Sequence, residues 1–272
     1  MSLTPTRIHH LTCATLCPSL RRVPGLVPDQ LVAHVLLLET AEGLVLVDSG
    51  FGTDDVAQGG RRLGRAFVAG VGPRLDLAQT ALHQVRALGH DPADVRHVVL
   101  THLDLDHAGG LADFPDAQVH LHRAELAAAL NPRLRERQRY VAAQWEHGPR
   151  WQPHDAGGED WCGFTAVRAV GDDVLLVPLP GHTRGHSGVA VRRPSGGWFL
   201  HAGDAYFFHG DKKRPRSCPP GLRSFQVMVQ ADRTARLVNL ERLQELHATR
   251  DDVTVFCAHD RAEFLALEGV TD

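Results

Sequence analysis

The sequence predicts an α/β fold, organised as one domain over residues 1–272. Strand-like apolar runs and helical patterns come in two successive groups, separated by a more polar middle segment. Two such groups suit two sheets with helices packed outside them. Hydrophobic residues fill 43% of the 272 positions, which is enough for a substantial core. The sequence shows no legible internal repeat and no low-complexity linker, so we expect a single domain.

The first group of expected elements precedes residue 131. A leucine- and valine-rich run over 31–39 and a second run over 44–47 flank the turn sequence TAEG, as in a pair of adjacent strands. Apolar residues at helical spacing over 77–88 stop at Gly89, which predicts a helix. The other elements expected in this group are strands over 95–100 and 119–121 and a helix over 125–130.

The middle segment differs in character, and we predict a variable insertion at 131–163. Arginine occupies every second position over 133–139, a spacing that would spread charge around a helix and indicates a solvated face. Aromatic residues follow, and they fit a hydrophobic acyl pocket, the seam of a homodimer, or ordinary packing. These residues are Tyr140, Trp145, Trp151, Trp161 and Phe164.

The second group of elements follows this insertion. Short β-branched and aromatic runs predict its strands, and apolar residues on one side of a long helical pattern predict its main helix. The expected elements are strands over 164–170, 174–179, 188–193, 198–202 and 254–258 and helices over 234–247 and 261–267.

Charge and cysteine content limit the classes of function. The net charge of −3 gives no basic field, so we expect no nucleic-acid partner. Five scattered cysteines form no disulfide framework, and the N-terminus lacks a secretory signal pattern. Charged residues interrupt the most apolar stretch, 31–47, so we expect no membrane span. These features indicate a cytoplasmic protein that acts on a small molecule.

Residues 101–110, THLDLDHAGG, carry the strongest functional signal in the chain. His102, Asp104, Asp106 and His107 crowd into six positions directly after an apolar run. Imidazole and carboxylate groups are the nitrogen and oxygen ligands that divalent metals bind in proteins. This spacing therefore predicts a metal-binding loop at the end of a strand.

Three further candidate ligands each follow a predicted strand. His182 stands in PGHTRGH, Asp204 in HAGDA and His259 in CAHD. A lone histidine at a strand end is more often structural, but together with the first motif these residues provide enough ligands for a binuclear site. His186 and His201 flank them, and each is either an orienting partner or an ordinary core or surface histidine.

These motifs resemble those of the metallo-β-lactamase fold superfamily, and most closely its N-acyl homoserine lactonase-like metallohydrolases. The resemblance covers 31–259, and the segments HHLTCATLCP and VDSGFG add to it. It implies an αβ/βα four-layer sandwich of two mixed sheets with outer helices and two metal ions at one edge of the sheets.

The resemblance also implies a role for each candidate ligand. Asp48 matches an aspartate that orients metal ligands without binding metal. The first ion would be held by His102, Asp104 and His182, the second by Asp106, His107 and His259, and Asp204 would bridge the two.

The chain departs from the family pattern at two positions. Asp104 stands where the usual motif, HxHxDH, has a second histidine; the added carboxylate removes one positive charge and favours harder metals. We therefore expect two divalent ions, zinc or, because of Asp104, iron or manganese, with zinc bound more weakly at the first position. The lactonases also have a substrate-polarising tyrosine where this chain has Phe207; Tyr206, one residue earlier, is a candidate for that catalytic role or a packing residue.

We predict a binuclear metal-dependent hydrolase of lactones or other carboxylic esters. A metal-bridging hydroxide would attack the carbonyl carbon, and Asp106 would accept the proton. A di-iron redox enzyme, suggested by Asp104, a phosphodiesterase on the same scaffold and a metal-binding protein without catalysis remain alternatives. The partner would be a small-molecule substrate, and the chain could form a homodimer.

Overall fold

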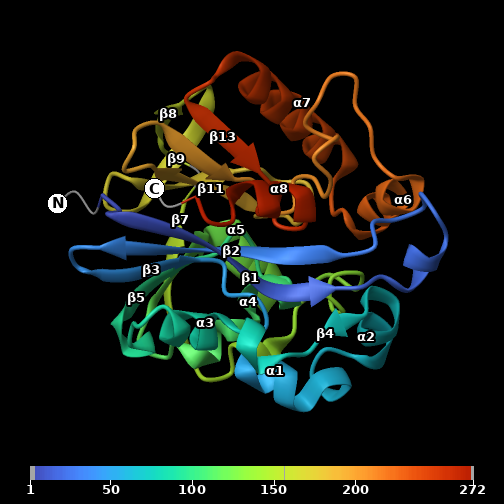
Figure 1. The fold of residues 1–272 in the computed structure, drawn as a ribbon, viewed down its shortest axis with the longest axis horizontal. Helices are drawn as coiled ribbons and strands as arrows, with labels where there is room; N and C mark the ends of the chain where they lie inside the picture. The colour runs from blue at the N-terminus through green and yellow to red at the C-terminus, as the bar shows by residue number, and fades with distance from the viewer. Residues whose placement is uncertain (1–3, 156, 271–272) are drawn as a thin grey trace.

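The structure is a computed structural model that describes residues 4–155 and 157–270. Two β-sheets, one of seven strands and one of six, lie face to face, and helices cover their outer sides (Figure 1). The predicted α/β sandwich with two mixed sheets is therefore confirmed.

The first sheet mixes parallel and antiparallel pairs. In spatial order its strands are β4 (Pro73–Arg74), β1 (Arg7–Leu16), β2 (Leu31–Thr40), β3 (Gly43–Val47), β5 (Val95–Val99), β6 (Gln118–His122) and β7 (Arg150–His154). In spatial order the second sheet contains β13 (Val253–Phe256), β12 (Trp198–His201), β11 (Ser187–Arg192), β10 (Val174–Pro178), β9 (Phe164–Val170) and β8 (Glu159–Trp161).

The α-helices are mostly short. They are α1 (Thr53–Gln58), α2 (Arg65–Val71), α3 (Ala81–Ala87), α4 (Leu105–Ala108), α5 (Arg123–Leu130), α6 (Pro220–Val229), α7 (Arg233–Thr249) and α8 (Arg261–Leu267). The 3₁₀ turns are η1 (Ser19–Arg22), η2 (Gly59–Arg61), η3 (Leu77–Gln79), η4 (Pro92–Asp94), η5 (Gly109–Asp113) and η6 (Ala142–Gln144).

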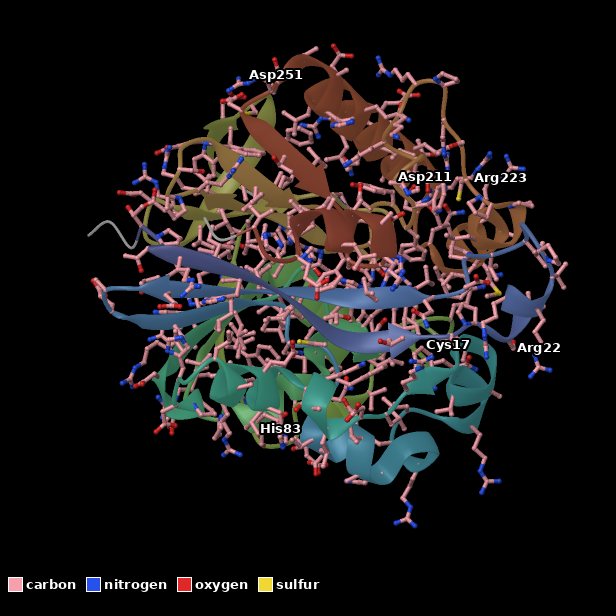
Figure 2. All side chains as sticks on the ribbon, viewed as in Figure 1. Cys17, Arg22, His83, Asp211, Arg223 and Asp251 are labelled. Atoms are coloured by element: carbon pink, nitrogen blue, oxygen red, sulfur yellow. The ribbon has the colours of Figure 1, made fainter. Side chains whose placement is uncertain are left out.

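Alternating side chains of the strands build three separate apolar layers. In β2, Leu36 and Leu38 pack between the two sheets, whereas Leu37 packs on the opposite face toward α3 and α5. In β10, Leu176 faces the other sheet and Val177 faces α7. Because both faces of these central strands are covered, their sequences are almost continuously apolar. Charged side chains such as Arg22, Arg223 and Asp251 lie at the outside of this packing (Figure 2).

Some elements differ from the sequence-based prediction. The helix expected over 77–88 is divided by Thr80, whose hydroxyl accepts the His83 N–H and caps a shorter α3. Strand β1 was not predicted, and neither were α1, α2 and α6. In β1, polar His9, His10 and Thr12 break the apolar run, and the segment is a strand because it pairs with β2 and, at its end, with β4.

The segment 131–163 contributes strands to the edges of both sheets. Strand β7 pairs in parallel with β6, and β8 pairs with β9. The aromatic cluster predicted there is divided between two cores: Tyr140 and Trp145 pack under the first sheet, and Trp161 and Phe164 under the second. Ordinary packing therefore explains these side chains. One domain over residues 1–272 with a variable insertion stays a prediction.

The strand directions bring five loops to one edge of the sandwich. Strands β3 and β5 run parallel, so the loops after them leave at the same end of the first sheet. Strand β10 is antiparallel to β11, as β11 is to β12, and β12 is parallel to β13, so β10, β12 and β13 also share a direction. Side chains that follow the carboxyl ends of these strands can therefore converge.

Two of these loops pack backbone against backbone through glycine. The Gly110 N–H donates to the Gly50 carbonyl at 3.1 Å and to Ser49 Oγ at 3.2 Å. A Cβ atom at Gly110 would lie 2.7 Å from the Ser49 carbonyl oxygen, a backbone atom that cannot move alone. This contact fixes the loop over 101–110 against the loop after β3.

We expect Gly110→Ala to lower the free energy of unfolding by about 1–3 kcal/mol, because the added methyl group forces the two loops apart. Urea denaturation of the purified variant measures this loss. Gly70→Ala is the matched control, since a Cβ at Gly70 meets no atom within 4 Å. Equal stability of both variants and the wild type would contradict this account of the loop contact.

Candidate metal centre

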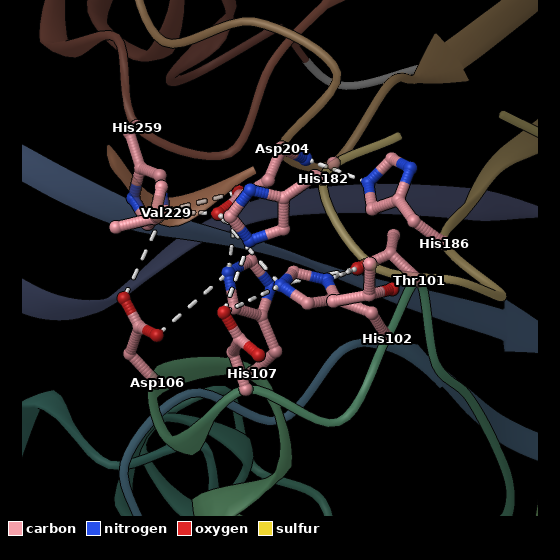
Figure 3. Close-up of polar contacts among 12 residues, drawn as sticks. Thr101, His102, Asp106, His107, His182, His186, Asp204, Val229 and His259 are labelled. Carbon is pink, nitrogen blue, oxygen red and sulfur yellow. Dashed lines mark hydrogen bonds and ion pairs between the residues drawn. The ribbon is translucent and has the colours of Figure 1, made fainter. Parts of the chain in front are cut away.

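Histidine and aspartate side chains from the converging loops meet at the carboxyl edge of the sheets (Figure 3). The loop after β5 carries four of them, and the loops after β10, β12 and β13 carry one each. All seven candidate ligands of the sequence analysis are brought together here. They form two groups, His102, Asp104, His182 and Asp204 in one and Asp106, His107 and His259 in the other.

The potential ligand atoms within each group lie within 4.8 Å of one another. In the first group, His182 Nε2 is 3.0 Å from Asp104 Oδ2 and 3.3 Å from Asp204 Oδ2. His102 Nε2 lies 3.5 Å from the same oxygen of Asp104. The imidazole nitrogens and one oxygen of each carboxylate therefore face a common point.

Asp204 lies between the two groups: its Oδ1 faces the second group, and its Oδ2 contacts both groups, at 3.2 Å from His259 Nε2 and 3.3 Å from His182 Nε2. Its Oδ1 is 3.3 Å from His107 Nε2 and 3.0 Å from His259 Nε2. Its Oδ2 faces His182 on the other side. Asp106 completes the second group, with its Oδ2 at 3.7 Å from His259 Nε2. This geometry fits a carboxylate that is shared by two cations.

Asp48 orients two of the imidazole rings, one by a direct hydrogen bond and one through the Thr101 hydroxyl. Its Oδ2 accepts the Nδ1–H of His107 at 2.8 Å and the hydroxyl of Thr101 at 2.8 Å. The Thr101 oxygen in turn accepts the Nδ1–H of His102 at 2.9 Å. With Nδ1 protonated, Nε2 of each ring carries a free lone pair toward the cluster. Asp48 therefore lies where the resemblance placed it.

Backbone groups fix two more members of the cluster. The Nδ1–H of His259 donates to the Val32 carbonyl at 2.7 Å, which turns its Nε2 toward Asp204. His186 donates to the Leu179 carbonyl through Nδ1 and accepts the Asp204 N–H at Nε2, both at 2.9 Å. His186 thus has the orienting role that the sequence left open.

The concentrated charge shifts the pKa values of these groups in opposite directions. Burial alone would raise the pKa of Asp204, but His259, His107 and His182 hold it well below its usual value. Burial alone would lower the pKa of His259, but Asp204 raises it to about 9. The cluster therefore stabilises ionised carboxylates and attracts positive charge.

The donor set fits divalent cations. His102 Nε2, His107 Nε2 and Asp204 Oδ1 are buried and have no hydrogen-bond partner among the described residues. Buried polar atoms without partners are rare and need a ligand to satisfy them. Nitrogen and carboxylate oxygen donors in groups of three or four are the ligands of zinc, iron and manganese.

Tyr206 is not brought into the cluster. Its side chain is fully buried in the core under the second sheet, and its hydroxyl donates to Glu263 Oε1 at 3.1 Å. The neighbouring Phe207 faces the cluster instead, with its ring centre 5.0 Å from that of His259. The predicted substrate-polarising role of Tyr206 is therefore wrong in this geometry, and its packing role holds. The chain turns here after β12, so that Ala205 and Tyr206 pack in the core under the second sheet while Phe207 and Phe208 join the apolar cluster beside the ligand groups.

Arg139 belongs to the site and was missed. Its Nε lies 3.1 Å from Asp104 Oδ1, and its side chain is only 14% exposed. The regular spacing of four arginines predicted a solvated face, but this segment forms turns and buries Arg139 alone among them. A signal was present in Asp104, since an extra buried carboxylate calls for a compensating cation.

Comparisons with known proteins agree with this fold and site. Residues 28–259 match the model of the Metallo-beta-lactamase superfamily. A probable metallo-hydrolase of Mycobacterium tuberculosis is 42% identical over 261 residues, which cover 94% of this chain and 81% of that protein. The N-acyl homoserine lactonase AttM of Agrobacterium fabrum is 32% identical over 190 residues, 69% of this chain and 66% of the relative.

A solved structure has the same fold. It is an N-acyl homoserine lactone hydrolase with the product N-hexanoyl-L-homoserine at its catalytic metal centre. The two chains superpose with a TM-score of 0.74 and 21% identity, over 97% of this chain and 96% of the other.

Two sheets with a histidine and aspartate cluster at their carboxyl edge support a metal-dependent hydrolase, as the sequence predicted. The chain belongs to the metallo-beta-lactamase superfamily. Among residues 4–155 and 157–270, no helix has the length and apolar character needed to cross a membrane.

In the chelator-treated protein we expect the His259 imidazole to stay protonated up to about pH 9. Since this pKa lies above the unfolded value of 6.5, the protonation stabilises the metal-free fold below pH 6.5, and this contribution is lost as the pH rises through 9. Asp204→Asn should lower the pKa of His259 by about 1–3 pH units, because it removes the main raising charge.

Histidine-ring NMR of the metal-free proteins measures this titration. Asp251→Asn, which changes an exposed carboxylate, should leave the His259 titration unchanged. A pKa for His259 near 6.5 in the wild type would contradict the described electrostatics.

Proposed function

We propose that this chain is a binuclear metal-dependent hydrolase that opens lactones with an apolar N-acyl chain. The observation that carries the proposal is the pair of ligand groups that share Asp204. His102, Asp104 and His182 would hold the first ion, and Asp106, His107 and His259 the second. The relatives named lactonases support the choice of a lactone as the substrate class.

When bound, two divalent ions would supply an ionised water as nucleophile and would polarise the carbonyl oxygen of the substrate. The chain's own contribution is to hold and orient the ligands and to accept the proton. Asp106 is the carboxylate we assign to that proton, because its side chain is 12% exposed and Asp204 only 4%, whereas Asp104 is paired with Arg139. A carboxylate that reaches solvent can release the proton after each turnover.

Apolar side chains beside the cluster support an acyl-bearing substrate. The Phe207 ring centre lies 5.7 Å from that of His182 and 5.9 Å from that of Phe225 in α6. Both phenylalanines belong to an apolar cluster that also includes Leu105, between the metal-loop aspartates, and Val229. An acyl chain that packs against these groups would leave its lactone carbonyl near the ligand groups.

We expect about two equivalents of divalent metal per purified chain and hydrolysis of N-acyl homoserine lactones. Elemental analysis measures the metals, and a pH indicator records the acid released from the lactone. Prolonged chelation should abolish turnover, and zinc, iron or manganese should restore it, the best ion identifying the metal. His102→Ala should lose at least about tenfold in metal affinity, because it removes a direct ligand.

The same assays test the alternatives. Turnover of a chromogenic phosphodiester without any lactone hydrolysis would replace the proposed substrate class. Full activity after complete removal of metal would reject the proposal itself. An iron-dependent optical spectrum with redox turnover and no hydrolysis would favour the di-iron enzyme.

We expect Phe225→Ala to raise KM for a long-chain acyl lactone by about tenfold and to change KM for a short-chain lactone much less, since a lost phenyl contact removes about 1–3 kcal/mol of acyl-chain binding. The turnover number should change little, because this contact is not specific to the transition state. Met228→Ala, on the same helix but 73% exposed, is the matched control. Equal effects on both chain lengths would place the acyl chain elsewhere.

A further inference from the structure

We infer that Arg139 and Asp104 act as one unit at the first metal position. The guanidinium holds one carboxylate oxygen and cancels the negative charge, so that the pair offers the metal a single donor atom without net charge, as a neutral imidazole does. This inference rests on the proposed metal centre and deepens it. It makes Arg139 a positioning residue that tunes the first metal.

The two oxygens of Asp104 have different partners. Oδ1 is 3.1 Å from Arg139 Nε. Oδ2 is 3.0 Å from His182 Nε2 and 3.5 Å from His102 Nε2, so it faces the other donors of the first group. The Arg139 contact is an ion pair without a hydrogen bond to Oδ1, and it leaves Oδ2 as the oxygen that faces the other donors. We therefore expect Asp104 to offer the cation one ligand atom, Oδ2, while Oδ1 stays beside the Arg139 charge.

The remaining donors of Arg139 hold the loops that surround this position. One terminal nitrogen donates to the His182 carbonyl at 2.8 Å. The other donates to the Val229 carbonyl at 2.7 Å and lies 3.4 Å from His182 Nε2. The guanidinium therefore connects the loop after β5, the loop after β10 and the end of α6. A lysine ammonium, which lacks this planar fork, could not make the three contacts in the same directions.

Neighbouring residues fix Arg139 in this place. Glu136 forms an ion pair with Arg184, with 2.9 Å between its Oε1 and the Arg184 Nε. The Tyr140 hydroxyl donates to the buried Glu125 at 3.1 Å. Arg139 lies between these two residues in the sequence. Their contacts hold the turn after α5 in place, and this turn directs the Arg139 side chain toward the cluster.

The charges of the site explain why the pair belongs together. Asp104 and Arg139 are each only 14% exposed, and an unpaired charge at such burial is strongly destabilising. The Arg139 charge keeps the pKa of Asp104 well below its usual value, although burial opposes this. The charge that we expected Asp104 to subtract from the metal site is thus restored by Arg139. The expectation of weaker zinc binding counted only the motif residues and omitted this cation.

The test is a set of zinc dissociation constants measured by competition with a chromophoric chelator. Asp104→His leaves the Arg139 charge beside the cation, so zinc binding should weaken by about tenfold or more, as when an outer partner is lost. Adding Arg139→Gln removes that charge, and the double variant should recover at least about tenfold in affinity. If the two residues had independent structural roles, the second substitution would not restore zinc affinity, because the effects of independent substitutions add.

Arg139→Lys in the Asp104→His background separates the effect of the positive charge on zinc binding from the effect of the side-chain volume. Lysine frees room but keeps the positive charge, so this double variant should bind zinc as weakly as Asp104→His. Recovery with lysine, or no recovery with glutamine, would overturn the inference. Arg137→Gln, an exposed arginine of the same segment, is the control and should not change zinc affinity.

Two further measurements keep the test decisive. If Asp104→His fails to fold, judged by circular dichroism of the metal-free protein, Asp104→Asn with and without Arg139→Gln gives the same comparison at constant side-chain shape. If the proposed centre itself is wrong, His102→Ala will bind zinc as the wild type does. That result differs from a failed rescue in a chain whose zinc binding does depend on His102.

Discussion

Three carboxylates held in one poorly exposed space are the constraint on which the rest of this structure depends. Asp104, Asp106 and Asp204 converge within the two ligand groups, and like charges at such distances repel strongly where water is scarce. The fold accepts this arrangement only because positive or proton-donating groups surround it. Imidazole rings, the Arg139 guanidinium and, in our proposal, two divalent ions balance the carboxylates. Metal binding therefore follows from how the chain concentrates negative charge.

Two other buried carboxylates hold the loops that carry these ligands. Asp48 sits at a positive φ of 59°, which aspartate tolerates better than most residues, and accepts from Thr101 and His107. Glu125 accepts the Leu103 N–H, the Thr183 hydroxyl and the Gly185 N–H, at 3.0, 2.6 and 3.1 Å. It thus ties the loop after β5 to the loop after β10. Neither carboxylate belongs to the two candidate ligand groups, yet both hold the loops or the imidazole rings of those groups in place.

Local sequence signals predicted most of the central sandwich and the candidate ligands. Continuous apolar runs identify strands that are buried on both faces, and the spacing of the 101–110 motif indicates four candidate ligands. Features that depend on contacts between residues far apart in the sequence could not be predicted from local patterns. Strand β1 is recognised as a strand by its pairing with β2. The place of Arg139 in the site is recognised by its ion pair with Asp104, which lies 35 positions earlier in the chain. The role considered for Tyr206 was wrong because the turn after β12 directs its side chain into the core, and spacing along the sequence does not reveal the path of a turn.

The most direct test of the account is the position of the metal ions themselves. A crystal structure of the zinc-loaded protein, with anomalous scattering recorded on both sides of the zinc edge, locates each ion independently of the protein atoms. We predict two anomalous peaks on either side of Asp204, with Asp104 bound through Oδ2 while Arg139 stays on Oδ1. One peak, no peak, or an ion outside the two ligand groups would contradict the account.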